Sequence, residues 1–192
     1  MLIESFLDYL RLERNYSERT IVSYRTDLRE FGGFLENTEA ELDWKKVHAD
    51  HVRNWMVSLM EGGKAATSVN RKLSSLRSFY RFLLRKKLVA VNPMLKIVGP
   101  KKKKPLPFFV REKDMNRLLD EIPFKEGFEG CRDRTILEMF YATGMRLSEL
   151  IGLNDADVDF ASKLIKVTGK RNKQRLIPFG KELEEDLNLY IK

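Results

Sequence analysis

Apolar residues recur at every third or fourth position through most of the first hundred residues, which is the spacing of amphipathic helices. Three such stretches come first. They cover residues 2–14, residues 17–35 with Ser17 as the expected N-cap, and residues 51–61 with Asp50 as the expected cap. The pattern predicts helices that bury their apolar sides against one another in a bundle.

A fourth stretch, residues 67–88, predicts a helix with two chemically different sides. One narrow arc holds its large apolar residues: Val69, Leu73, Leu76, Tyr80 and Leu83. The opposite side holds polar and basic residues: Asn70, Ser74, Arg77, Ser78, Arg81 and Arg85, with Arg71 beside them. A helix with such a face can lie in the major groove of DNA. A basic face that is merely solvated is the alternative.

From residue 108 onward the pattern becomes a mixture of helices and short strands. Helical spacing is expected over residues 111–121, over 132–141, just after Arg146, and from 182 to the end. Three short β-like runs are residues 158–160, 164–168 and 175–178. The predicted fold is therefore mainly α, with a small three-stranded antiparallel sheet in an α+β second half.

The predicted domain organisation has three parts. Residues 1–96 are expected to form a helical bundle, and residues 108–192 the α+β part of the chain. Between them, residues 97–107 contain three prolines and the run Lys101–Lys104, and prolines with like charges keep a linker extended.

Charge also divides the chain near this linker. Residues 1–107 contain 21 Lys and Arg against 12 Asp and Glu, a net charge of +9, whereas residues 108–192 contain 15 against 16, a net charge of −1. Residues 62–111 contain 14 basic side chains and no acidic one. Because a solvated surface normally mixes both signs, this stretch indicates a polyanionic partner. A basic surface that serves only solubility is the alternative.

Several other classes are excluded. The sequence contains no apolar run near the roughly 18 residues of a membrane span, and its start lacks the basic residues of a signal peptide. The single cysteine, Cys131, excludes an internal disulfide and fits a reducing cytoplasm. His48 and His51 lack partners at convincing zinc-ligand spacing, so they are expected to be structural or solvent-facing.

Candidate chemistry is concentrated in residues 141–153. Thr143-Gly144 is a turn signal and helical spacing follows it, so Arg146 is expected in or just before the first turn of a helix. Backbone N–H groups and the helix dipole favour an anion there, and a guanidinium adds a fork for two phosphate oxygens. Glu149 lies close enough to orient that arginine. An Arg-x-x-Glu motif alone is more often a surface arginine on an amphipathic helix. Here the basic turn 169–173 follows between two expected strands, and this combination favours a functional site.

These two stretches together resemble the tyrosine recombinase, or phage-integrase, family, and most closely its Xer-type members. The family pattern is an A-T-G-x-R-x-S-E-L helix start followed by a G-K-x-x-K hairpin. The S-x-x-T-x-x-x-Y-x-x-D-L-x-x-F run that begins at Ser17 resembles the start of the family's core-binding domain. The resemblance implies a four-helix SAM-like core-binding bundle, followed by the first part of the recombinase catalytic domain.

The resemblance also implies an enzyme that cleaves and rejoins DNA through a 3′-phosphotyrosine, with no metal or cofactor. Arg146 matches the family's first catalytic arginine, Lys170 its hairpin lysine and Glu149 the supporting acid; Lys173 is the alternative lysine. Arg171 stands where the family turn commonly has a second glycine. The family's His-x-x-Arg box and nucleophilic tyrosine have no match, because Tyr190 follows Lys170 too closely. The chain is therefore expected to bind DNA without recombining it.

The implied partners are double-stranded DNA and further recombinase protomers, in a tetramer on two synapsed sites, and the implied task is chromosome dimer resolution. A phage or transposon integrase is the first alternative, and a non-catalytic DNA-binding regulator is the second. The residues expected to contact DNA are Arg19, Arg25, Asn70, Arg71, Ser74, Arg77, Arg81, Arg85, Lys101, Lys102, Lys103, Lys104 and Lys173.

Overall fold

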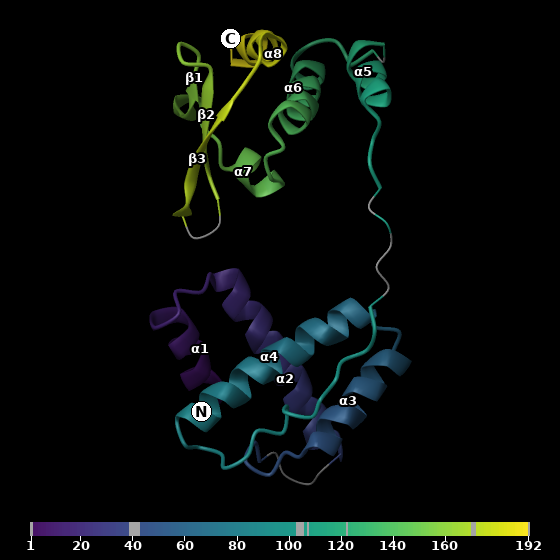
Figure 1. Ribbon diagram of the computed structural model, residues 1–192, viewed down its shortest axis with the longest axis vertical. Coiled ribbons are helices and arrows are strands. Elements are labelled where there is room, and N and C mark those ends of the chain that lie inside the picture. Colours follow the sequence, from purple (N-terminus) through teal and green to yellow (C-terminus); the bar gives the residue numbers. More distant parts are fainter. Residues whose placement is uncertain are drawn as a thin grey trace. The chain divides into compact units, whose positions relative to one another are not determined.

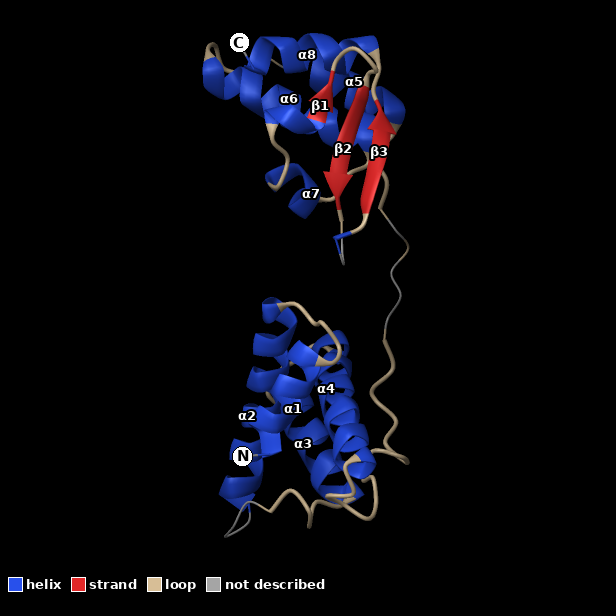
Figure 2. Cartoon of the chain, turned by 90° about the vertical axis from the view of Figure 1, so that its left-hand side faces the viewer, coloured by secondary structure: helices blue, strands red, loops and turns tan. Residues whose placement is uncertain are grey.

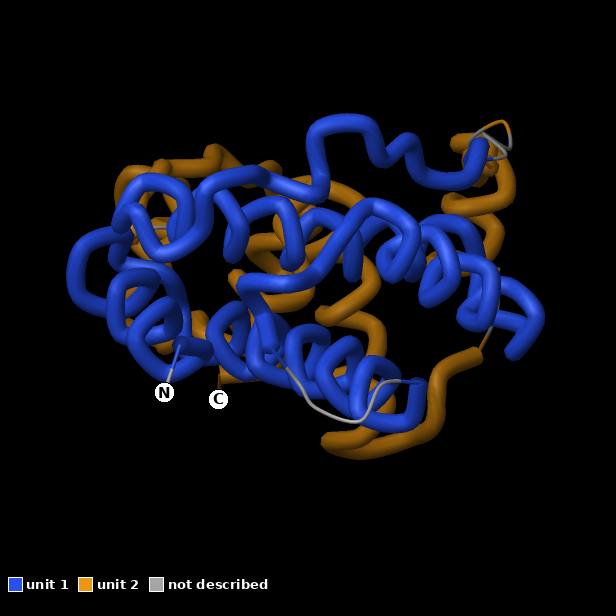
Figure 3. The backbone as a smooth tube through the Cα atoms, turned by 90° about the horizontal axis from the view of Figure 1, so that it is seen from below, with its two compact units in different colours: residues 1–105 blue, residues 106–192 orange. Residues whose placement is uncertain are grey.

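The computed structural model describes residues 2–38, 43–102, 106, 108–121, 123–169 and 172–191. The chain divides into two compact units, Met1–Pro105 (unit 1) and Leu106–Lys192 (unit 2), which Figure 3 draws in different colours. Helices dominate, and a three-stranded sheet lies in unit 2 (Figure 2). The predicted fold class is confirmed. None of the described helices is long and apolar enough to cross a membrane.

In the described part of unit 1, four helices form a bundle (Figure 1). They are α1 (Leu2–Leu12), α2 (Glu18–Thr38), α3 (Ala49–Glu61) and α4 (Ala66–Arg85). The α1–α2 turn is fixed where the Tyr16 N–H donates to the Leu10 carbonyl at 3.0 Å, with Asn15 at a φ of 49°. Ser17 precedes α2 as expected, and its Oγ accepts a long hydrogen bond of 3.4 Å from the Thr20 N–H.

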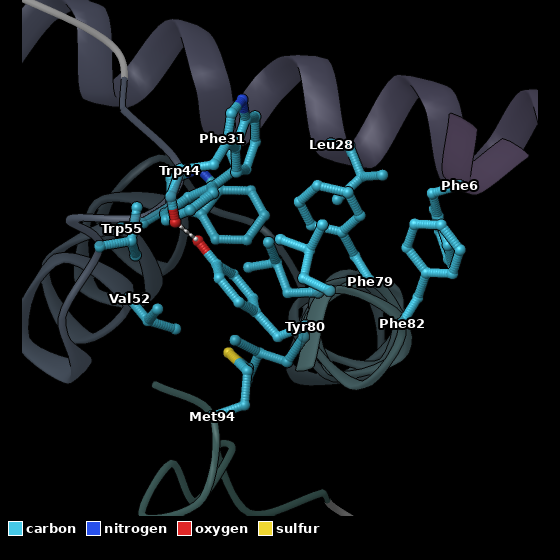
Figure 4. Packing of buried hydrophobic residues seen from close by; sticks show 14 of the residues in the cluster. Phe6, Leu28, Phe31, Trp44, Val52, Trp55, Phe79, Tyr80, Phe82 and Met94 are labelled. Atoms are coloured by element: carbon cyan, nitrogen blue, oxygen red, sulfur yellow. Dashed lines mark hydrogen bonds between the residues drawn. The ribbon is translucent and has the colours of Figure 1, made fainter. Parts of the chain in front are cut away.

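Aromatic rings fill the centre of unit 1 (Figure 4). The ring centroids of Phe31 and Trp55 are 4.9 Å apart, and Phe79 meets Trp44 edge-on at 5.1 Å. The Tyr80 hydroxyl donates to the Trp44 carbonyl at 3.2 Å, and burial raises the pKa of Tyr80. Burying one large apolar side chain contributes roughly 1.5–3 kcal/mol. This core therefore fixes α4 firmly, so the outer side of α4 is a defined surface.

The apolar arc predicted for α4 is confirmed, because all five of its residues are buried: Val69, Leu73, Leu76, Tyr80 and Leu83. The helix also buries Lys72 and Ser75, two polar residues that the apolar pattern does not single out. Both side chains bond to Asp27 of α2.

The segment after α4 folds back along unit 1. Met94 and Ile97 are buried in the bundle core. Arg77 Nη2 donates to the Ile97 carbonyl and Asn70 Nδ2 donates to the Pro100 carbonyl, both at 2.9 Å. Residues 97–100, expected in the linker, therefore lie against α4.

Unit 2 combines helices with a small sheet. Its helices are α5 (Glu112–Asp120), α6 (Phe128–Thr143), α7 (Leu147–Ile151) and α8 (Lys181–Ile191), with a 3-10 turn, η1, at Asp155–Asp157. The predicted strands are confirmed as β1 (Val158–Asp159), β2 (Leu164–Thr168) and β3 (Gln174–Pro178), antiparallel in the order β1-β2-β3. The core between sheet and helices contains Met139, Met145, Ile165, Val167, Phe179, Leu183 and Leu187.

Two helix starts differ from the sequence prediction. His48, and not Asp50, is the N-cap of α3, and its backbone N–H donates to Nδ1 of His51 at 3.0 Å. A ring nitrogen thus takes the place that a glutamate carboxylate occupies in a capping box. Helix α6 begins at Phe128, four residues before the expected start at residue 132, and it follows Gly127 at a φ of 83°. Gly127 bears no side chain that could have marked this start.

Candidate active site and nucleic-acid interface

Arg146 stands between two helices of unit 2. Helix α6 ends at Gly144, whose φ of 58° is left-handed and whose N–H donates to the Phe140 carbonyl at 3.0 Å. Glycine adopts this conformation without the strain that a Cβ would bring. Arg146 follows as the extended N-cap of α7, where the motif predicted it. Its side chain remains 71% exposed.

The carboxylate of Glu149 is the centre of the site, and it is only 1% exposed. It accepts hydrogen bonds from the backbone N–H and from Nη1 of Arg146, both at 2.8 Å. Arg175 of β3 donates to the same carboxylate from Nη1 at 2.7 Å and from Nη2 at 2.8 Å. One buried acid therefore joins the start of α7 to the sheet and orients two guanidinium groups.

This cluster carries a net positive charge. The fork of Arg175, followed by the backbone N–H of Arg146, lowers the pKa of Glu149 to about 2 from its ordinary 4.5. The same contact raises the pKa of Arg175. Two arginines and one ionised carboxylate leave one positive charge at neutral pH. Within the described residues, Nε and Nη2 of Arg146 make no hydrogen bond, so this exposed guanidinium can still bind two oxygens of a phosphate.

The turn between β2 and β3 closes beside Glu149. The Gly169 N–H donates to the Lys173 carbonyl at 2.7 Å, and a Cβ on Gly169 would lie 3.0 Å from Glu149 Oε1. Glycine therefore permits this close approach. Lys170 and Arg171 lie outside the described residues, so the role predicted for Lys170 stays a prediction. Asn172 takes the positive φ of the turn, 57°, which asparagine tolerates better than most residues.

Arg175 is the residue of this cluster that the sequence interpretation missed, because the β-like pattern treats it only as the start of a strand. A signal was present. Arg175 shares a face of β3 with Ile177, and it pairs across the sheet with Val167, which is fully buried. An arginine on the inward face of a strand requires an acidic partner, but the pattern alone does not give the register that brings it to Glu149.

A second buried carboxylate, Asp27, lies between α2 and α4. Arg71 donates to it through Nη1 at 2.6 Å and Nη2 at 2.9 Å, and Ser75 Oγ donates at 2.7 Å. Lys72 lies 3.4 Å from the same carboxylate and bonds to Glu30 as well. The negative charges of Asp27 and Glu30 balance the positive charges of Arg71 and Lys72. Arg71, predicted to contact DNA, therefore also holds two helices of unit 1 together.

The other predicted DNA contacts differ in how they are engaged. Arg25 donates to Glu4 at 3.2 Å, while Asn70 and Arg77 bind the carbonyls of the segment that follows α4. These side chains can reach DNA only by sharing or giving up those bonds. The exposed members of the set are Arg19, Ser74, Arg81, Arg85, Lys101, Lys102 and Lys173. Lys103 and Lys104 lie outside the described residues, and all of these DNA contacts stay predictions.

The remaining candidates have structural surroundings. His51 takes part in the start of α3, and Tyr190 stacks on Phe128 with 5.6 Å between ring centroids. Over the described ranges, no group of three or more His, Cys, Asp or Glu side chains is placed to hold a metal ion.

Two protein-family descriptions match this chain. Residues 3–87 match the phage integrase N-terminal SAM-like domain, and residues 109–192 match the phage integrase family. The two matches cover most of unit 1 and nearly all of unit 2.

Curated relatives match almost the whole chain. A tyrosine recombinase XerC of Staphylococcus carnosus (strain TM300) is 41% identical over 189 residues, which are 98% of this chain and 63% of the relative. A tyrosine recombinase XerC of Pediococcus pentosaceus is 42% identical over 191 residues, 100% of this chain and 64% of the relative. The chain thus spans less than two thirds of the length of these relatives.

Solved structures share the fold. The Tn1549 transposon integrase (residues 82–397), in complex with circular intermediate DNA, superposes with a TM-score of 0.74 at 17% identity and covers 99% of this chain and 64% of that one. A lambda integrase dimer bound to a COC′ core site gives 0.71 at 15% identity, covering 98% and 67%. At such identities the likeness concerns the fold alone.

Proposed function

The chain belongs to the phage-integrase family of tyrosine recombinases, and from this membership we propose that it is the DNA-binding and phosphate-binding part of a Xer-like site-specific recombinase. In the proposed reaction, a tyrosine hydroxyl gives up its proton, and its oxygen attacks a DNA phosphodiester and forms a bond to the 3′ phosphate. The bond to the 5′ oxygen breaks, and that oxygen takes a proton and leaves as a hydroxyl. Rejoining reverses these steps, so neither ATP nor a metal is required.

The geometry of Arg146 and Glu149 is the observation that supports this proposal best. Attack on a phosphodiester concentrates negative charge on the phosphate oxygens, and fixed cations stabilise that charge. Arg146 is exposed, and Glu149 fixes it through its own backbone N–H and one guanidinium nitrogen. Arg175 shares the buried carboxylate and keeps the local charge positive. A DNA-binding regulator without catalysis would have no need of this arrangement.

Lys170 is proposed as the proton donor to the departing 5′ oxygen, with Lys173 as the alternative. A substrate with a 5′-bridging sulfur tests this role, because sulfur leaves without a proton. In a protein that carries the complete catalytic domain, Lys170→Ala should slow cleavage of the normal substrate strongly and the sulfur substrate much less. Lys173→Ala is the matched control, and equal damage to both substrates by Lys170→Ala would contradict the assignment.

Unit 1 is proposed to bind duplex DNA. Its support is the part of the acid-free stretch that lies in unit 1, residues 62–105 with 13 basic residues, together with the polar outer side of α4. The two structural neighbours were solved with DNA. Further protomers are proposed as partners in a tetramer on two synapsed sites, in the cytoplasm. The XerC names of the curated relatives favour chromosome dimer resolution over the integration of a mobile element.

The first test is the salt dependence of DNA binding by the 192-residue chain. Six phosphate contacts would reduce the affinity roughly a thousandfold between about 50 and 200 mM salt. Fluorescence anisotropy with a labelled duplex measures this. An affinity that does not change with salt would contradict the proposed DNA surface.

The second test separates groove reading from attraction to the backbone. Arg77→Ala should reduce discrimination between target and random duplex by about 1–3 kcal/mol, because an arginine that reads a base edge contributes about that much. Lys102→Ala in the linker is the control and should weaken both complexes equally. If Arg77→Ala also weakened both equally, α4 would not read bases through Arg77.

A further inference from the structure

A basic cavity on unit 1 brings Arg14 together with Arg81 and Arg85, and the function proposed above does not assign the part of DNA that they contact. Its volume is about 260 Å³, and it lies where α1, the α1–α2 turn and the C-terminal half of α4 meet. The turn contributes Arg14 and Tyr16, and α4 contributes Ser78, Arg81 and Arg85. The lining residues include no aspartate or glutamate.

The three arginines of this cavity lack counter-ions. Within the part of the chain that the structure describes, Arg14, Arg81 and Arg85 form no ion pair. Other arginines of the same bundle are neutralised: Arg11 bonds to Asp8 and Glu18, and Arg71 bonds to Asp27. Three unpaired like charges around one cavity repel one another, so an anion between them would be stabilised by all three.

The ring of Tyr9 fixes the position of one of these arginines, Arg85. The Arg85 guanidinium carbon lies 4.3 Å above the centre of the Tyr9 ring, and that ring stacks on Phe82 at 5.1 Å. Phe82 is itself buried in the core. A cation held over an aromatic face keeps the nitrogens at its edge available for a ligand. The cavity therefore has a supported wall and is not merely a cluster of mobile surface side chains.

We propose that this cavity binds one phosphate of the DNA backbone. The inference rests on the proposed DNA binding and names a contact within it. A phosphate offers charged oxygens to several guanidinium groups at once, whereas the edge of a base is neutral. Arg81 and Arg85 are thereby assigned to the backbone and not to base reading. Arg14 is a new contact, and Tyr9 is the residue that positions Arg85.

The salt dependence of binding to a random duplex tests this contact in the 192-residue chain. The slope of log K against log salt changes by about 0.9 for each phosphate contact with duplex DNA. Arg14→Ala and Arg81→Ala should each reduce the slope by part of that amount, because the remaining arginines still hold the phosphate. The double variant should reduce the slope by no more than about 0.9, because both arginines hold the same phosphate. Arg11→Ala removes the same charge from a paired arginine, so it is the control and should leave the slope unchanged.

Tyr9 provides an independent test. Tyr9→Phe keeps the ring beneath Arg85 and should bind like the original chain, whereas Tyr9→Leu should weaken binding to every duplex equally. Fluorescence of Trp44 and Trp55 in the core checks that each variant is folded. A slope for Arg81→Ala equal to that of Arg11→Ala would overturn the inference, and so would a double variant that lost two contacts. If the original chain bound DNA with salt dependence while these variants behaved alike, the proposed function would stand and only this contact would fail.

Discussion

Asp27 in unit 1 and Glu149 in unit 2 are both buried carboxylates, and each is held by a two-pronged hydrogen bond from an arginine of another element. They differ in what surrounds them. Asp27, Glu30, Arg71 and Lys72 form a neutral set that bridges α2 and α4. Glu149 is shared by two arginines, so its set is positive, and Arg146 is 71% exposed.

The difference shows how one interaction can serve two purposes. Around Asp27 every charge is matched inside the bundle, so the network fixes helix positions and leaves little for a ligand. Around Glu149 the acid is satisfied while one arginine is held at the surface with nitrogens to spare. A buried acid of the first kind supports the fold, and one of the second kind prepares a cation for an external anion.

Removing Asp27 should produce the largest loss of stability. Asp27→Ala leaves the buried Lys72 with Glu30 as its one acidic partner among the described residues, and it releases Arg71 and Ser75. Unit 1 should therefore lose about 3 kcal/mol of unfolding free energy. Urea unfolding followed by the fluorescence of Trp44 and Trp55, both in unit 1, measures this. Asp8→Ala, which removes an exposed acid of α1, is the control and should shift stability by less than about 0.5 kcal/mol. If the two variants unfolded at the same urea concentration, the bonds of Asp27 to α4 would not stabilise unit 1.

Truncating Arg71 or Arg146 should cost less stability than truncating Asp27, and the loss should again be larger in unit 1 than in unit 2. Arg71→Ala removes two hydrogen bonds to Asp27 from a half-exposed side chain, and should cost about 1–2 kcal/mol. Arg146→Ala removes an exposed side chain and should leave the stability of unit 2 within about 0.5 kcal/mol. Thermal unfolding followed by circular dichroism gives both values. A larger loss of stability for Arg146→Ala than for Arg71→Ala would contradict the assignment of Arg71 to structural support and of Arg146 to ligand binding.

Acid should expose the contribution of Glu149 to the stability of unit 2. Its pKa is about 2 in the folded chain against an ordinary 4.5, so its stabilisation is complete above 4.5 and is lost as the pH falls toward 2. Glu149→Gln should remove this part of the pH dependence of unit 2. Amide exchange at buried Val167 reports on unit 2, which contains neither tryptophan. Identical pH profiles for the two proteins between 4.5 and 2 would contradict the bonding of Glu149.

Periodicity and turn chemistry in the sequence predicted much of the fold. The inward residues of α4 and the three strands follow from spacings of 3.6 and 2, because burial of one side decides them. The N-cap position of Arg146 follows from the Thr143-Gly144 turn. These are local signals, and the structure agrees with them.

Contacts between distant segments could not be predicted in the same way. The bonds from Arg175 to Glu149 and from Arg71 to Asp27 join residues 26 and 44 positions apart, and no local pattern gives their register. The segment 97–100 reads as a linker because of its glycine and proline, yet Asn70 and Arg77 bind its carbonyls. His48 was not expected as a cap because histidine is an uncommon partner at helix starts.

Covalent capture of a nicked suicide DNA substrate tests most directly the claim that Glu149 holds Arg146 ready for a scissile phosphate. The 192-residue chain should form no adduct, because it contains no His-x-x-Arg motif and its Tyr190 stacks on Phe128. The same chain joined to the C-terminal third of a XerC relative should form one, and Arg146→Ala in that protein should reduce adduct formation by about a hundredfold or more, as expected for the loss of a key electrostatic contact. An adduct on Tyr190 of the 192-residue chain, or an undiminished adduct with Arg146→Ala, would contradict the account.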